Sequence, residues 1–225
     1  MGTDSVEDYR YLAARRRLIE TIRSRGIEDL DLLRLFDEVP RHRFLPEGIR
    51  HRAYEDAPLP IGYGQTASQP SLQAYVLHVL QPGPDDKILE IGTGSGFLTA
   101  LLARMGDRVY SVERVRELST RARKVLDEMG FPNIALLVGD GTIGWRKYAP
   151  YDVMTVAAAS PSVPSPLVDQ LAPGGRLVLP VGSRQEQDLV LVTRDEDGTV
   201  HEGTVQERCT FVPLLGKYGW SEEGS

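Results

Sequence analysis

The sequence predicts a doubly wound, Rossmann-like α/β fold whose sheet is mostly parallel with an antiparallel edge, plus an N-terminal helical extension. From Lys87 onward, short apolar runs alternate with helix-like stretches, and a glycine-rich turn follows the first run. Continuous apolar runs are typical of parallel strands, because helices cover both faces of their sheet. A turn signal at DEDG (195–198) predicts that the last two strands pair antiparallel. The expected strands are KILEIG, RVYSVE, IALLVGD, YDVMTVAAA, RLVLPVG, DLVLVTR and CTFVPL.

The first third of the chain has a helical pattern instead. Apolar residues at helical spacing predict one helix that ends near Gly26 and a second that Pro40 stops. A loop-rich region follows up to Pro70, and another helix begins near Ser71. We therefore expect helices and an active-site loop region in residues 1–70, the α/β domain in 71–217, and a flexible tail in 218–225.

The composition argues against several kinds of partner. Lys and Arg total 26 against 32 Asp and Glu, so the net charge of −6 disfavours nucleic acid. The basic clusters 15–17 and 41–43 are short, and we expect them to be solvated or locally ion-paired. No signal peptide or long apolar run is present, so we expect a cytoplasmic protein without a membrane partner.

The residues that most often bind metals are too few for a metal site. Cys209 is the single cysteine, which excludes an intramolecular disulfide and a Cys-rich site. It falls in an expected strand, so we expect a buried thiol. The four histidines are scattered, and each is expected to be structural or exposed: His42, His51, His78 and His201.

The stretch ILEIGTGSGF contains the strongest chemical signal. Glycines at 92, 94 and 96 after a strand allow a tight turn and a close approach of ligand to backbone. The dinucleotide fingerprint would need a glycine at 97, where Phe97 stands. Glu90 would face a pyrophosphate badly and suits a cationic ligand. Its alternative role is to anchor the loop through backbone N–H groups.

Two more acids follow the next two expected strands. Glu113 ends RVYSVE, where a carboxylate can accept hydrogen bonds from both ribose hydroxyls. Asp140 lies in VGDG, where it can reach an adenine amino group. Together with the glycine loop and Glu90, these acids predict S-adenosylmethionine (AdoMet) as cofactor, with S-adenosylhomocysteine as product.

The acceptor is predicted from what the chain lacks. The strand ending VAAASPSVP has no Asn/Asp-Pro-Pro-aromatic tetrad to hold a base nitrogen, and no general base is evident. A carboxylate with a pKa near 4 needs none, because it is already ionised at neutral pH. The protein then has to align the reacting atoms and exclude water. The residues alone therefore indicate an AdoMet-dependent enzyme with a carboxyl acceptor.

Several segments resemble the protein-L-isoaspartate (D-aspartate) O-methyltransferase family over roughly Val39 to Leu214. They are VPRHRFLPE, AYEDAPLPIGYGQTASQP, LEIGTGSGF, VGDGTIGW, APYD, LAPGGRLVLPVG and FVPL. The resemblance implies methylation of isoaspartyl α-carboxylates in damaged proteins and peptides, which leads to repair through a succinimide, by a protein expected to be monomeric. Two alternatives stay open: a carboxyl methyltransferase dedicated to one peptide, and a non-catalytic AdoMet-binding protein.

The resemblance also implies roles for individual residues. Ser68 matches the family's active-site serine, and Ala158 and Ala159 match small residues near the substrate carboxylate. Two positions depart from the family pattern: Ala67 stands where Ile is common, and Ser160 where Ala is common. The implied cofactor contacts are Ile61, Thr66, Glu90, Gly92, Gly94, Glu113, Arg114, Asp140 and Gly141.

Overall fold

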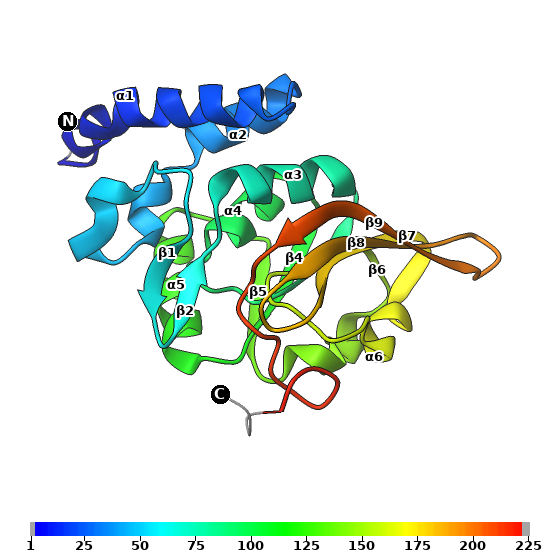
Figure 1. Ribbon diagram of the computed structural model, residues 1–225. Helices are drawn as coiled ribbons and strands as arrows, with labels where there is room; N and C mark the ends of the chain where they lie inside the picture. Colours follow the sequence, from blue (N-terminus) through cyan, green and yellow to red (C-terminus); the bar gives the residue numbers. More distant parts are fainter. Residues whose placement is uncertain (1–2, 222–225) are drawn as a thin grey trace. The chain divides into compact units, whose positions relative to one another are not determined.

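The computed structural model describes residues 3–221, and the chain divides into two compact units between Val79 and Leu80 (Figure 1). That division falls inside the helix expected to begin near Ser71. The expected boundary at residue 70 stays a prediction.

The first unit contains the helices that the sequence indicates. Asp29 caps the second of them by accepting hydrogen bonds from the backbone N–H groups of Asp31 and Leu32. Pro70 is the first residue of the last helix, where its missing N–H costs nothing. The elements are α1 (Thr3–Ser24), α2 (Leu30–Glu38), η1 (Arg41–Phe44), η2 (Glu47–Arg52), β1 (Leu59–Gly62), β2 (Gln65–Ala67) and α3 (Pro70–Leu80).

Two expectations for this unit were wrong. The region predicted as loop contains two 3-10 helices and the β1–β2 hairpin, whose strands are too short to produce a recognisable alternation. The second basic cluster is not solvated: Arg41 is 1% exposed and His42 2% exposed. Burial is tolerated because both side chains find hydrogen-bond partners, and Arg15 of the first cluster is buried in the same way.

The second unit is built on a seven-stranded sheet in the order β5-β4-β3-β6-β7-β8-β9. Strands β3 to β7 pair in parallel, whereas β8 and β9 pair antiparallel at the edge, as predicted. The strands are β3 (Lys87–Ile91), β4 (Arg108–Glu113), β5 (Ile134–Val138), β6 (Tyr151–Val156), β7 (Leu171–Gly182), β8 (Gln187–Arg194) and β9 (Val200–Cys209).

Strand order reverses at β3, which fixes where a ligand can bind. Strands β4 and β5 are added on one side of β3, and β6 and β7 on the other. Because parallel crossovers are right-handed, the reversal places successive connections on opposite faces and opens a crevice at the carboxyl ends. The connecting helices are α4 (Phe97–Met105), α5 (Arg116–Glu128), η3 (Gly141–Ile143), η4 (Arg146–Tyr148) and α6 (Ser165–Val168).

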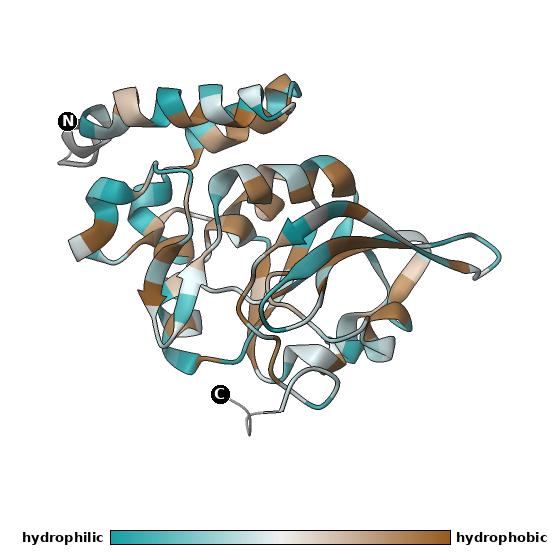
Figure 2. Cartoon of the chain, in the orientation of Figure 1, coloured by the Kyte–Doolittle hydropathy of each residue, from teal (hydrophilic) through white to brown (hydrophobic). Residues whose placement is uncertain are grey.

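Apolar side chains of the central strands form the core of this unit, and Figure 2 shows these strands mostly in brown. Leu89, Met154 and Leu177 stand on three neighbouring strands and are at most 1% exposed. Glycine is needed at Gly106, where a Cβ would lie 2.4 Å from Cδ1 of Ile88 and 2.9 Å from the carbonyl of Asp86.

The last expected strand was wrong in its residues. The strand is the polar segment Val200–Cys209, not CTFVPL, because an edge strand paired on one side does not need an apolar sequence. Cys209 ends it as the expected buried thiol, and burial raises its pKa to about 11. The segment after it pairs instead with Ala159, whose N–H donates to Val212 and whose carbonyl accepts from Leu214.

The end of the chain is described up to Ser221. Backbone N–H groups of Tyr218 and Trp220 donate to the Thr142 hydroxyl and the Leu214 carbonyl. Residues 222–225, which belong to the expected tail, lie outside the described residues. Among the described helices, none is long and apolar enough to cross a membrane.

Candidate functional site

The predicted residues of the second unit meet at the carboxyl ends of four neighbouring strands. The glycine loop follows β3, Glu113 ends β4, Asp140 follows β5, and Ala158 follows β6. Backbone hydrogen bonds continue between these strands past their ends. The N–H of Gly92 donates to Val112 at 2.8 Å, and that of Ala157 donates to Ile91 at 2.8 Å.

The glycine loop has the backbone that only glycine adopts readily. Gly92, Gly94 and Gly96 have φ of 95°, 53° and 87°, all in the left-handed region. A Cβ on Gly92 would lie 3.4 Å from Cβ of Ala157. Gly96 directly precedes α4, so the loop opens onto the N-terminus of a helix, which favours a polar ligand group.

Glu113 joins this loop to the next strand. Its Oε2 accepts a hydrogen bond of 2.8 Å from the N–H of Gly94, and its Oε1 one of 2.8 Å from the N–H of Val115. The side chain is 6% exposed. Each carboxylate oxygen has a second lone pair, so Glu113 retains capacity to accept bonds from hydroxyl groups of a ligand.

Asp140 is held at the end of the third strand. Its Oδ1 accepts from the N–H and hydroxyl of Thr142 at 2.8 and 2.7 Å, and its Oδ2 accepts from the N–H of Lys217 at 2.9 Å. Burial acts to raise its pKa, but these hydrogen bonds and the charge of Arg114 outweigh it and lower the pKa below its ordinary value. Asp140 is therefore ionised at neutral pH.

Glu90 is completely buried, at 0% exposure. Its Oε2 accepts from the hydroxyls of Thr99 and Ser111, each at 2.6 Å, and Thr93 lies 2.5 Å from the Ser111 hydroxyl. Burial raises the pKa of Glu90 to about 8 despite these bonds, and the charge of Glu113 adds to the rise. Glu90 thus bonds to side-chain hydroxyls, and not to the backbone N–H groups of its alternative role. Contact with a cofactor stays a prediction.

The sequence reasoning missed the hydroxyl residues that organise these acids. Ser111 stands in the otherwise apolar strand RVYSVE, and Thr99 in the apolar helix FLTALLARM. A lone hydroxyl in a buried apolar element is the signal that would have found both, since buried polar groups need partners. Thr142 had no comparable signal.

The residues predicted on the loop IGYGQTASQP lie on the hairpin of the first unit. Ile61 in β1 is buried at 1% exposure, Thr66 in β2 is exposed, and Ser68 directly follows β2. The Ser68 hydroxyl makes no hydrogen bond with the described residues. Ala67 is buried and pairs with Leu59 across the hairpin.

The backbone around Ser68 is fixed by two charged side chains. The Arg41 guanidinium donates to the carbonyl of Ser68 at 2.8 Å and to that of Ala53 at 2.9 Å. Asp56 accepts from the N–H of Ser71 at 2.9 Å and from the amide of Gln69 at 3.0 Å. Burial lowers the pKa of Arg41 to about 10, so the guanidinium remains charged at neutral pH. The sequence did not predict that Arg41 holds the backbone at Ser68.

The two alanines predicted for the acceptor site are also buried, with Ala158 9% and Ala159 0% exposed. The next residue, Ser160, is 0% exposed, and its hydroxyl has no hydrogen-bond partner among the described residues. An unpaired buried hydroxyl lowers stability by about 1–3 kcal/mol.

Within residues 3–221, no three His, Cys, Asp or Glu side chains are grouped to hold a metal ion. His42 is buried, with Nδ1 2.9 Å from the Tyr54 hydroxyl, and His201 pairs with Asp195 at the surface. His51 and His78 are exposed. His42 is therefore buried and the other three histidines are exposed, and that none of them is a ligand or base stays a prediction.

These features fit AdoMet on chemical grounds. The glycine turn lets a ligand approach the backbone, and carboxylates on two adjacent strand ends match the donors of a ribose and an adenine amino group. The fold and site together define the class of AdoMet-dependent methyltransferases. Within that class, the family model described as protein-L-isoaspartate(D-aspartate) O-methyltransferase matches residues 13–219. The chain belongs to this family.

Relatives of that name are similar over nearly their whole length. The chain is 49% identical over 211 residues to the protein-L-isoaspartate O-methyltransferase of Geobacter metallireducens, covering 93% of this chain and 97% of the relative. It is 49% identical over 204 residues to that of Methanoculleus marisnigri, covering 91% and 92%.

Solved structures agree with the fold. One named protein-L-isoaspartate O-methyltransferase has a TM-score of 0.79 at 28% identity, covering 91% of this chain and 67% of that one. A Plasmodium falciparum protein described by the same name, in complex with S-adenosyl-L-homocysteine, has a TM-score of 0.77 at 25% identity, covering 88% and 97%.

Glu90→Gln tests the burial of an acid under the loop. Because the pKa of Glu90 is raised from 4.5 to about 8, the folded protein binds this proton more tightly than the unfolded chain. The stabilisation from the protonated Glu90 side chain is complete below the pKa that Glu90 has in the unfolded chain. It is lost as pH rises through the pKa that Glu90 has in the folded protein. In thermal melts across that pH range, the melting temperature of the variant should therefore rise relative to that of the wild type as pH rises. A pH-independent difference, equal to that of the exposed control Glu117→Gln, would contradict the assignment.

Arg41→Lys tests whether the guanidinium of Arg41 holds the backbone at Ser68. A lysine ammonium lacks the planar fork that spans two carbonyls, so one charged hydrogen bond of about 1.5–3 kcal/mol is lost. Amide hydrogen exchange in residues 66–69 should accelerate on the order of ten- to a hundredfold. The matched control is Arg15→Lys, because Arg15 is also buried and donates to the carbonyl of Asp37. Equal acceleration in both variants would show that Arg41 has no particular hold on this segment.

Proposed function

We propose that this protein transfers a methyl group from AdoMet to the α-carboxylate of L-isoaspartyl residues in damaged proteins and peptides. The observation that carries the proposal is the pair of carboxylates at neighbouring strand ends beside the glycine loop, in a chain of this family. The resulting ester can close to a succinimide, whose hydrolysis returns part of the chain to normal aspartate. The reaction therefore begins a repair.

We assign the cofactor to the carboxyl ends of β3, β4 and β5. AdoMet supplies a methyl group on a positively charged sulfur. Glu113 would accept bonds from the ribose hydroxyls, and Asp140 and Gly141 would hold the adenine. The remaining proposed contacts are Ile61, Thr66, Glu90, Gly92, Gly94 and Arg114.

We assign the acceptor to small and hydroxyl side chains. In the first unit, the Ser68 hydroxyl is the proposed group that would orient the carboxylate. In the second unit, Ala158 and Ala159 are the proposed small residues for the acceptor. An ionised carboxylate needs no proton removed, which agrees with the scattered positions of the histidines. Positioning and exclusion of water are then what the protein contributes.

We propose a monomeric, cytoplasmic enzyme that acts on proteins and uses neither nucleic acid nor membrane as partner. The net charge of −6 supports the exclusion of nucleic acid.

A dedicated peptide acceptor is the second candidate. The unpaired buried hydroxyl of Ser160, next to the two proposed acceptor alanines, is the observation that favours it. A protein that retains such a cost can use the hydroxyl for a particular acceptor. A non-catalytic AdoMet-binding protein is the third and has no structural feature in its favour.

One assay separates these three functions. The protein is incubated with AdoMet and with peptides that differ only in an isoaspartyl or a normal aspartyl residue, in several sequence contexts. General repair predicts base-labile methyl ester and S-adenosylhomocysteine with every isoaspartyl peptide and with no aspartyl peptide. Activity on one aspartyl sequence would favour a dedicated acceptor, and cofactor binding without product would favour a non-catalytic protein.

Ser68→Ala tests the proposed acceptor contact. Removing the hydroxyl should lower isoaspartyl methylation at least about tenfold, as loss of one hydrogen bond to a charged group does. Binding of AdoMet, measured by calorimetry, should be nearly unchanged. Ser24→Ala, at the exposed end of α1, is the control. Unchanged turnover in Ser68→Ala would reject this role.

A further inference from the structure

The hairpin that leads to Ser68 has an unusual residue at its tip. Strands β1 and β2 are joined by Tyr63 and Gly64 alone, and the flanking residues Gly62 and Gln65 are paired. Both tip residues have positive φ, 56° for Tyr63 and 68° for Gly64. Two-residue hairpin turns of this kind strongly favour Asn-Gly, because asparagine tolerates the left-handed conformation and most side chains do not.

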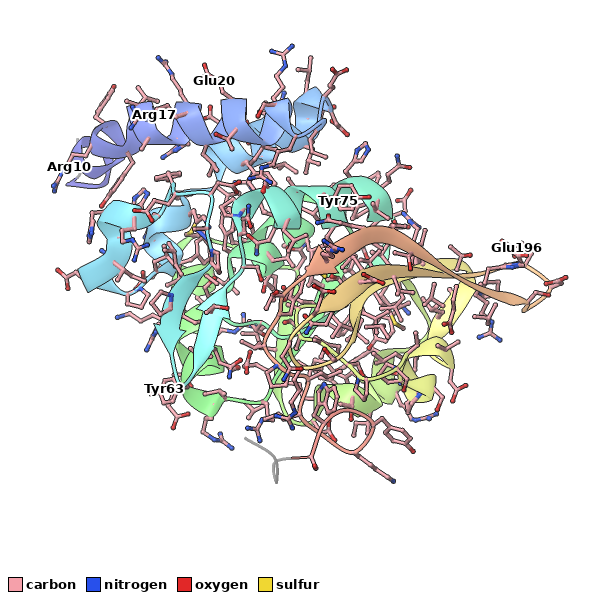
Figure 3. The ribbon with its side chains drawn as sticks, viewed as in Figure 1. Arg10, Arg17, Glu20, Tyr63, Tyr75 and Glu196 are labelled. Atoms are coloured by element: carbon pink, nitrogen blue, oxygen red, sulfur yellow. The ribbon has the colours of Figure 1, made fainter. Side chains whose placement is uncertain are left out.

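Folding does not account for a tyrosine at this position. Its side chain is 54% exposed, and Figure 3 shows it labelled at the tip of the hairpin. The surface beside it is open, since a Cβ on either Gly62 or Gly64 would meet nothing within 4 Å. The tyrosine therefore strains the turn without burying its ring. Strain of this kind, kept at one residue, directs attention to function.

The chain connects this residue directly to the proposed acceptor serine. Strand β2 runs from Gln65 to Ala67 and is followed at once by Ser68. At about 3.3 Å per residue, the extended chain from Tyr63 to Ser68 spans at most roughly 17 Å. An extended peptide covers the same length with about five residues. A peptide with its damaged residue at Ser68 can thus place a residue some four or five positions away against Tyr63.

We propose that Tyr63 is a docking contact for the acceptor peptide, and sets a preference for acceptors with chain extending about four or five residues beyond the isoaspartyl group. This rests on the proposed function. An aromatic ring with a polar tip contacts backbone and apolar side chains alike, which suits acceptors of varied sequence. The contact adds affinity for the acceptor and takes no part in the transfer.

The test is Tyr63→Asn, which improves the turn while removing the ring. The melting temperature should be equal to or above that of the wild type. For an isoaspartyl peptide with six residues on each side, KM should rise about three- to tenfold with kcat unchanged. For a peptide with two residues on each side, which is too short to reach, neither constant should change. The affinity for AdoMet should also be unchanged.

Two control variants make the result specific. Tyr63→Phe keeps the ring and should retain a KM near that of the wild type. Tyr9→Asn removes another exposed tyrosine, on α1, and should have no effect. An unchanged KM of Tyr63→Asn for the long peptide would overturn the proposal, as would equal losses on both peptides. Failure of the wild type to methylate any isoaspartyl peptide would instead overturn the proposed function, and this contact with it.

Discussion

The hydrogen bonds of the Glu113 carboxylate are the interaction on which the arrangement of the site depends. One oxygen holds the N–H of Gly94 in the glycine loop, and the other holds the N–H of Val115 at the start of α5. The same carboxylate therefore fixes the turn after β3 relative to the end of β4. Because strand order reverses at β3, this is also the place where a doubly wound sheet leaves its crevice. The Glu113 side chain thus holds the glycine loop in place and is also the proposed contact for the ribose hydroxyls of the cofactor.

Asp140 and Glu90 differ in their protonation at neutral pH. Asp140 is surrounded by donors that lower its pKa, whereas Glu90 is buried among hydroxyls with its pKa raised to about 8. At neutral pH the first is charged and the second is mostly neutral. The negative charge that the strand ends present to a ligand therefore comes from the carboxylates of Asp140 and Glu113 and not from Glu90. The acid before the glycines instead holds together Ser111 and Thr99, on β4 and α4.

Sequence alone predicted the sheet and most of the residues at its carboxyl ends, because both leave local patterns. Apolar runs mark buried parallel strands, and glycines and acids at strand ends are adjacent in sequence to them. The polar edge strand β9 was missed, because its sequence resembles a solvent-exposed segment. The buried Arg41 was also missed, since a guanidinium that is paired with carbonyls 12 and 27 residues away has no local signature. Tertiary partners decide such cases, and they are invisible in a single sequence.

The assignment of the cofactor to these strand ends is tested most directly by calorimetric titration of the wild type and of Glu113→Gln with S-adenosylhomocysteine. The amide keeps the size of the side chain but replaces one acceptor by a donor and removes the charge. We predict that the variant remains folded and that its affinity falls on the order of ten- to a hundredfold, as expected for lost hydrogen bonds to a charged group. The exposed Glu117→Gln should bind like the wild type. A folded Glu113→Gln protein with unchanged affinity would contradict the assignment of the cofactor to these strand ends.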